Sequence, residues 1–160
     1  MEQYGQQMNT PNSQKPSVMP STRPRAAIIA VAIWALIQVS RITAFSITQD
    51  VSAGVDSAAW LFPAFMDMFS GITAPFVAFF IWRKIGLAVW VTAIVWFILS
   101  ISDHIDALTA LFTVPLPQSM LAMGSSGFMT VLLVNTVLDV TVLILLTGKK
   151  MKSHYLSSPR

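Results

Sequence analysis

The sequence predicts an all-α integral membrane protein, a four-helix bundle with up-down-up-down topology. Of the 160 residues, 54% are hydrophobic and only 11% are charged, against roughly 25% charged residues in ordinary globular proteins. The hydrophobic residues are gathered into four long segments joined by shorter polar links. A helix satisfies its own backbone hydrogen bonds, which lipid cannot do. We therefore expect each segment to form one membrane-spanning helix.

The four apolar segments are consistent in length with this prediction. About 20 apolar residues are needed to cross the roughly 30 Å hydrocarbon core of a bilayer. The predicted helices cover residues 26–47, 57–82, 86–102 and 127–147. The third is short unless it continues into residues 103–112, where Ile105, Leu108 and Leu111 recur at helical spacing and also allow an interfacial helix. Pro115 and Pro117 then favour its end.

Polar segments flank the predicted helices. Residues 1–25 are rich in Gln, Asn, Ser, Pro and Thr, so they bury too little apolar surface to offset the entropy of ordering and are predicted to form a disordered tail. Residues 148–160 are predicted to form a basic tail. The chain contains no cysteine, which excludes disulfides, thiolate zinc sites and iron–sulfur clusters. His104 and His154 are predicted on opposite sides of the membrane, so we expect no cofactor of the bis-histidine haem type.

The basic residues predict the orientation of the bundle. Nine of the ten fall on one side of a four-pass topology, and the two opposite loops carry acidic residues instead. The nine are Lys15, Arg23, Arg25, Arg83, Lys84, Lys149, Lys150, Lys152 and Arg160. Lys and Arg accumulate in cytoplasmic loops, so both termini are predicted to be cytoplasmic, in an inner or plasma membrane. The same placement explains the net charge of +3 without a nucleic-acid partner.

Four polar residues are predicted to lie within the hydrocarbon, where a charge costs roughly 2.5–3.5 kcal/mol near a helix centre. At a rise of ~1.5 Å per residue, Arg41, Asp67 and Asn135 lie roughly 10–13 Å inside the outer helix ends and share one layer. Asp139 lies one turn deeper, on the face of Asn135. These four residues are candidate binding residues.

The roles of these residues divide into structural and functional alternatives. The first two helices are neighbours because their link is short, so Arg41 and Asp67 are predicted to form an ion pair. This pair either joins the helices or serves transport, and Arg41 could instead reach the interface. No basic residue is expected at the depth of Asp139. It is then either a protonated carboxyl of a proton-coupled carrier or a donor to Thr92, Ser100 or another subunit.

Small residues form a stripe on the predicted second helix and are expected to face the bundle, because they let backbones approach closely. The stripe comprises Pro63, Ala64, Asp67, Ser70, Gly71, Ala74 and Ala78. Among the aromatic residues, Trp60 and Trp82 are placed at the two membrane interfaces. The other tryptophans are interpreted as lipid-facing or core-packing residues.

A second candidate site lies on the outer side. Asp103, His104 and Asp106 follow the third predicted helix, and Asp50 and Asp56 lie in the other outer loop. Two carboxylates and an imidazole could bind a divalent cation, a small ligand or an enzyme substrate. Such a short acidic stretch is equally typical of a solvated loop.

The leading functional hypothesis is a non-enzymatic accessory or oligomeric membrane subunit. One alternative is a small proton- or ion-coupled transporter or channel that uses Asp139 and the Arg41–Asp67 pair. Another is a membrane enzyme with an outer-face site near His104. Expected partners are the lipid bilayer and a second copy or a larger membrane complex. In size and topology the chain resembles DoxX-like and other small four-pass bacterial membrane proteins, which implies the helix bundle and no particular activity.

Overall fold

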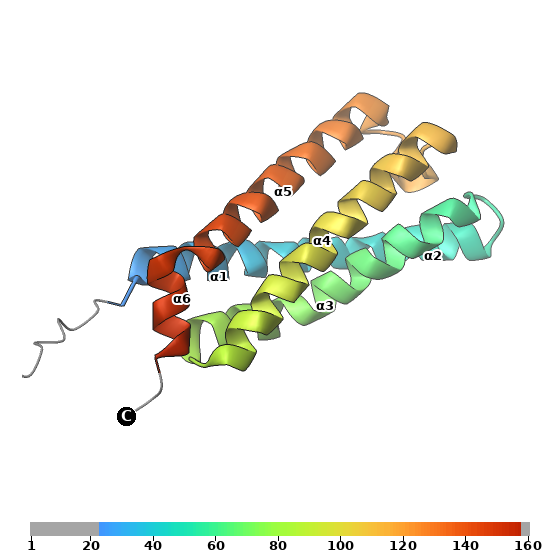
Figure 1. Cartoon of the computed structure of the whole chain (residues 1–160). Coiled ribbons are helices and arrows are strands. Elements are labelled where there is room, and N and C mark those ends of the chain that lie inside the picture. The colour runs from blue at the N-terminus through green and yellow to red at the C-terminus, as the bar shows by residue number, and fades with distance from the viewer. Residues whose placement is uncertain (1–22, 158–160) are drawn as a thin grey trace, which may run out of the picture.

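The computed structural model describes residues 23–157, and every secondary-structure element in this part of the chain is helical (Figure 1). Residues 1–22 of the predicted tail and residues 158–160 lie outside the described residues. Four helical runs are long and apolar enough to cross a membrane. They cover Arg25–Ser52, Ala58–Arg83, Leu87–Thr113 and Gly124–Thr147. The prediction of an all-helical chain with four membrane-length helices is thus confirmed for these residues.

The first run contains an unpredicted change of helix type. It consists of α1 (Arg25–Ile37), the 3-10 helix η1 (Gln38–Ala44) and α2 (Phe45–Ser52). A 3-10 helix has about three residues per turn, so residues three apart lie above one another. Gln38, Arg41 and Ala44 follow this spacing, and all three are buried. The 3-10 winding therefore aims the guanidinium and the amide at the same interior side.

The second run packs tightly against η1. It begins with the 3-10 helix η2 (Ala58–Trp60) and continues as α3 (Leu61–Arg83). The predicted stripe of small residues is buried, apart from the half-buried Asp67. A Cβ atom added to Gly71 would lie 2.6 Å from the backbone nitrogen of Ile42. Only glycine permits this approach of α3 to η1.

The third run continues beyond its shortest predicted length. Gly86, at a φ of +130° that side chains rarely allow, precedes α4 (Leu87–Thr113). The helix runs through Asp103 and His104 instead of ending at Ser102, because partners from other helices surround both side chains. At ~1.5 Å per residue its 27 residues extend about 40 Å.

The C-terminal part also differs from the prediction. The 3-10 helix η3 (Gln118–Met120) and α5 (Gly124–Thr147) are followed by a short helix, α6 (Lys149–Leu156), where a tail was predicted. Met151 and Tyr155 lie four residues apart and are buried, which holds α6 across the end of the bundle (Figure 1). The Tyr155 hydroxyl donates a 2.7 Å hydrogen bond to the carbonyl of Ile81 in α3.

Contacts at the two ends fix the course of the helices. Arg23 Nη2 donates a 2.6 Å hydrogen bond to the carbonyl of Trp82, so α1 begins where α3 ends. At the opposite end, Trp60 Nε1 donates a 2.8 Å hydrogen bond to the carbonyl of Pro115. Consecutive runs are therefore antiparallel. Within the bundle α1 packs on α3, α3 on α4 and α4 on α5, whereas α1 and α5 meet over a small area.

Two apolar cores lie at different heights along the bundle. One, near α6, includes Ile28, Val31, Ala74, Ile81, Phe97, Leu146 and Tyr155. The other, near the opposite loops, includes Ala44, Ile47, Trp60, Ala64, Ala107, Ala110 and Leu132. Apart from Thr48, which lies within the second core next to Ile47, the buried polar residues of every run fall between the members of these two cores. The polar side chains thus form a layer with apolar packing above and below it.

Candidate functional site

Arg41 is the centre of this polar layer. Its Nε and Nη2 atoms form ion pairs with Asp67 in α3 and Asp103 in α4. Nη1 donates a 2.6 Å hydrogen bond to Ser100 Oγ, also in α4. The side chains of Arg41 and Asp103 are only 7% and 2% exposed, while that of Asp67 is 32% exposed. The predicted Arg41–Asp67 pair is present, and a second carboxylate joins it.

Asp139 lies beside this group and is completely buried. Its Oδ1 atom accepts hydrogen bonds from Trp34 Nε1 at 2.6 Å and from Gln38 Nε2 at 3.3 Å. Asp139 thus accepts hydrogen bonds from Trp34 and Gln38, whereas one alternative from the sequence makes it a donor to Thr92 or Ser100. Its Oδ2 atom lies 3.8 Å from Nδ1 of His104, so a histidine is present at the depth where none was expected. The difference arises because α4 continues past Ser102 and carries His104 into the bundle.

These residues span all four helical runs in two adjacent groups of contacts, one around Arg41 and one around Asp139, which together we call the Arg41 cluster. It comprises Trp34, Gln38, Arg41, Asp67, Ser100, Asp103, His104, Thr136 and Asp139. Thr136 belongs to it because its Oγ1 atom lies 3.3 Å from His104 Nδ1 and donates to the carbonyl of Leu132. The two groups adjoin in η1, which carries Gln38 and Arg41, and in α4, which carries Asp103 and His104.

The cluster carries more negative than positive fixed charge. Arg41 supplies one guanidinium, and Asp67, Asp103 and Asp139 supply three carboxyl groups. Asp103 Oδ1 and Asp139 Oδ2 are buried and have no hydrogen-bond partner in the described part of the chain. An uncompensated ion out of water costs several kcal/mol. The excess charge and the two unpartnered oxygens therefore require a chemical explanation.

A shallow hollow approaches the cluster from the end opposite α6. It has a volume of about 220 Å³ and lies between α3 and α4. Its lining residues are Ala59, Phe62, Pro63, Asp106, Thr109, Ala110 and Thr113. Asp106 lies one turn beyond Asp103, and Pro63 lies one turn before Asp67 on their helices. None of the residues of the cluster lines this hollow, which is one helical turn away from both Asp67 and Asp103.

No protein-family model, curated protein sequence or solved structure matches this chain.

The remaining candidate residues lie apart from the cluster. Asn135 is half-buried and makes no side-chain hydrogen bond within residues 23–157. Thr136, rotated by one position, takes the inner place beside His104. The outer acidic residues do not gather around His104, since Asp106 lines the hollow and Asp56 accepts a 2.9 Å hydrogen bond from the Gln118 backbone. Among the described residues, no group of three or more acidic or histidine side chains is arranged to hold a metal ion.

Sequence reasoning missed the hydrogen bonds of the tryptophans. Besides Trp34, three others donate their indole N–H to another element: Trp60 to Pro115, Trp90 to the Leu146 carbonyl at 2.9 Å, and Trp96 to Thr73 Oγ1 at 2.8 Å. Trp34 lies within an otherwise apolar sequence. For Gln38 the sequence does contain a signal, because it precedes Arg41 by three residues and the two side chains therefore lie on the same side of a helix. For Trp34, no local pattern points to Asp139.

Proposed function

We propose that this chain is a small multi-pass protein of the cell membrane, with both termini cytoplasmic, whose Arg41 cluster binds and releases protons as in a proton-coupled carrier. The observation that carries the proposal is the ratio of three buried or half-buried carboxyl groups to one guanidinium. A joint between helices needs one acid for one base. The additional acids are what a proton-binding site requires.

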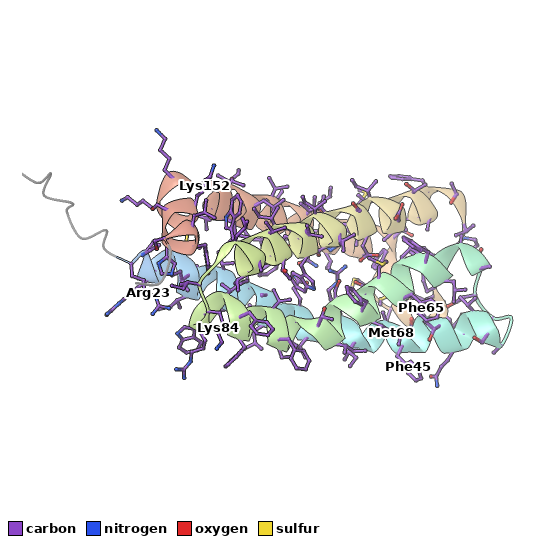
Figure 2. The ribbon with its side chains drawn as sticks, turned by 60° about the horizontal axis from the view of Figure 1, so that its bottom comes forward. Arg23, Phe45, Phe65, Met68, Lys84 and Lys152 are labelled. Atoms are coloured by element: carbon purple, nitrogen blue, oxygen red, sulfur yellow. The ribbon has the colours of Figure 1, made fainter. Side chains whose placement is uncertain are left out.

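The placement of basic residues supports the orientation. Arg23, Lys84 and Lys152 lie together at the end of the bundle where α6 is found (Figure 2). They belong to the nine basic residues on one side of the four-pass topology. The positive-inside rule assigns this end to the cytoplasm, and hence the hollow beside Asp106 to the outer side.

Charge balance supports proton binding. With neutral histidine and ionised carboxyls, the cluster has a formal charge of −2, from one guanidinium and three carboxylates. Two bound protons would remove this excess and supply O–H or N–H donors where unpartnered oxygens now stand. One of them can be shared between Asp139 Oδ2 and His104 Nδ1, which are 3.8 Å apart. The other can reside on Asp103, whose Oδ1 atom is unpartnered.

The two apolar cores support a coupled mechanism rather than a pore. They pack above and below the cluster, so a proton cannot follow a continuous polar route through residues 23–157 in this conformation. We assign exchange on the outer side to Asp67, the partly exposed acid of the cluster, which lies one helical turn from Pro63 in the lining of the hollow. Exchange with the cytoplasm requires a second arrangement of the helices.

Infrared spectroscopy of the protein in liposomes tests proton binding. A protonated buried carboxyl gives a C=O band that shifts in heavy water, and the chain has only seven acidic residues to assign. We expect such a band, sensitive to pH, in the wild type and a weaker band in Asp139→Asn and in Asp103→Asn. Asp50→Asn, in the last turn of α2 and outside the cluster, is the matched control and should leave the band unchanged. A wild type without the band would overturn the proposal.

The accessory-subunit function is the second candidate, because the Arg41 cluster joins all four runs and such contacts stabilise membrane bundles. Asp139→Asn separates the two candidates. A proton-binding function predicts loss of pH-dependent proton uptake with the fold retained, whereas a purely structural function predicts a change in thermal stability or assembly alone. The enzyme alternative gains no support, because His104 faces Asp139 in the interior while Asp106 lines the outer hollow.

A further inference from the structure

A long apolar groove runs along the seam between α1 and α3. It has a volume of about 370 Å³, and small residues lie between larger ones along it. Its lining residues are Ile29, Ala32, Ile33, Leu36, Pro75, Ala78, Phe79 and Trp82. From Ile29 to Leu36 the groove extends about 10 Å along α1, at ~1.5 Å per residue. Its shape suits an apolar chain that lies parallel to the helices.

The groove continues into a second hollow with a different character. This hollow, of about 150 Å³, is lined by Arg23, Arg25, Ile28, Ile29 and Trp82. Ile29 and Trp82 line both hollows, so the two are contiguous. Neither lining contains an acidic residue. The resulting site is apolar along its length and positively charged at the end that carries the basic residues (Figure 2).

From this arrangement we infer that the α1–α3 seam binds an anionic phospholipid, with an acyl chain in the apolar groove and the phosphate between Arg23 and Arg25. Guanidinium groups bind phosphate oxygens in a bidentate manner. Basic pockets at the cytoplasmic ends of membrane helices are suited to anionic headgroups. The site is separate from the Arg41 cluster, so this inference does not depend on proton binding.

Charge complementarity selects this occupant over a second copy of the chain. The end of the seam carries Arg23 and Arg25. An identical copy would bring the same positive charges to this surface. An anionic lipid neutralises them and fills the groove with matching apolar surface.

Native mass spectrometry of the full-length protein tests the inference. The protein is released from nanodiscs that contain equal amounts of phosphatidylglycerol and phosphatidylcholine, and the ratio of the two lipids retained is measured. We expect phosphatidylglycerol to be enriched on the wild type. Each basic residue near the membrane surface contributes about 1 kcal/mol to the binding free energy of an anionic lipid. We therefore expect the Arg23→Gln/Arg25→Gln double variant to lose this enrichment roughly 30-fold.

The Arg83→Gln/Lys84→Gln double variant is the matched control, since it removes the same charge at the same end but outside the lining of the hollow. Its enrichment should fall far less. Arg23 also hydrogen-bonds to the Trp82 carbonyl, so Arg25→Gln alone, with its melting temperature measured, separates lipid loss from misfolding.

The apolar half of the site is tested by Ile33→Trp, which places a larger side chain in the groove at an exposed position outside the two apolar cores. This variant should lose long-chain phosphatidylglycerol while its melting temperature is maintained. Equal losses in the two double variants would overturn the inference, as would displacement of the lipid by inorganic phosphate. A lipid-free dimer that buries Ile33 and Phe79 would also overturn it.

Discussion

Arg41 supplies the one guanidinium of its cluster. Removing Arg41 and removing one of its carboxylate partners are therefore expected to change the stability by different amounts. Removing the guanidinium leaves Asp67 and Asp103 with no cation. Removing one carboxylate leaves Arg41 still paired with the other and lowers the excess of negative charge. Breaking a buried pair by removing one partner typically costs 3–5 kcal/mol when an uncompensated charge remains.

We therefore expect Arg41→Gln to destabilise the protein by about 3–5 kcal/mol, and Asp103→Asn to change its stability by less than about 1 kcal/mol. Reversible unfolding in mixed micelles would measure both changes. Ser102→Ala, an exposed neighbour on α4, serves as the neutral reference. Equal destabilisation by the two cluster variants would contradict an excess of negative charge.

Gly71 is a second position where one residue determines the packing. An alanine there would place its Cβ atom 2.6 Å from the Ile42 nitrogen and 3.1 Å from its Cα, so η1 and α3 must separate. We expect Gly71→Ala to cost about 1–3 kcal/mol, although alanine is the better helix former. The melting temperature in detergent gives the measurement.

Gly127→Ala is the control for that substitution, because its added Cβ would meet the flexible side chain of Met123. It should be neutral or slightly stabilising, since alanine favours the helix by up to about 1 kcal/mol. If both glycine variants behaved alike, the close approach of η1 to α3 would not be responsible for the loss at Gly71.

Among the elements, η1 and α6 influence the structure of the interior most, apart from the membrane-length helices themselves. The 3-10 winding of η1 places Gln38 above Arg41 and so connects the Asp139 group with the Arg41 ion pairs. α6 contributes differently, since it closes the end of the bundle with Met151 and Tyr155. Burial, followed by the nearby Arg23 charge, lowers the pKa of His154 below its usual value of 6.5. Burial raises the pKa of Tyr155 to about 12.

These pKa shifts predict that the packing of α6 against the bundle is most stable between about pH 6.5 and pH 10. The lowered pKa of His154 means that its contribution is present above the unfolded value of 6.5 and is lost as the pH falls. The raised pKa of Tyr155 means that its contribution is present below the unfolded value of 10.0 and is lost as the pH rises toward about 12.

Thiol labelling checks this window without background, because the chain contains no cysteine. Met151→Cys reports on the buried side of α6 and Lys150→Cys on its exposed side. The ratio of their labelling rates removes the pH dependence of the thiol itself. The protection of position 151 should be greatest within the window and should decrease on both sides, and a constant ratio would contradict the prediction.

At the scale of the whole molecule, the bundle is stratified into two apolar cores with a charged layer between them. The sequence alone predicts much of this arrangement, because membrane-length apolar segments and the position of basic residues are strong local signals. The short link between the first two helices also made the Arg41–Asp67 pair predictable. Predicting this pair requires only the approximate depth of each residue along its helix.

The rest of the site depends on exact helix rotation and length. Asn135 and Thr136 differ by one position, about 100° around the helix, and only the structure shows which faces His104. Asp103 and His104 lie beyond the shortest predicted end of the third helix, and the sequence leaves open whether that helix continues, as α4 does to Thr113. Trp34 and Asp139 meet across 105 positions, a contact that no local pattern encodes.

The orientation proposed for the bundle predicts a definite labelling pattern. Lys84→Cys and Ser157→Cys should react with a membrane-impermeant thiol reagent only from the cytoplasmic side. Val55→Cys and Gln118→Cys, in the two opposite loops, should react only from the outside. Right-side-out and inverted vesicles provide the measurement. Labelling of Lys84→Cys from the outside would reverse the assignment.

The long sequence separation between Asp139 and its donors also imposes an order on biosynthesis. Trp34 and Gln38 leave the ribosome 105 and 101 residues before the carboxylate that they bind. At ~5–20 residues per second, this delay amounts to roughly 5–20 s. The first three runs are therefore synthesised before their interior can be completed. A chain stalled before α5 leaves Trp34 and Gln38 without the carboxylate that they bind, which gives cellular quality control a means of distinguishing unfinished copies from finished ones.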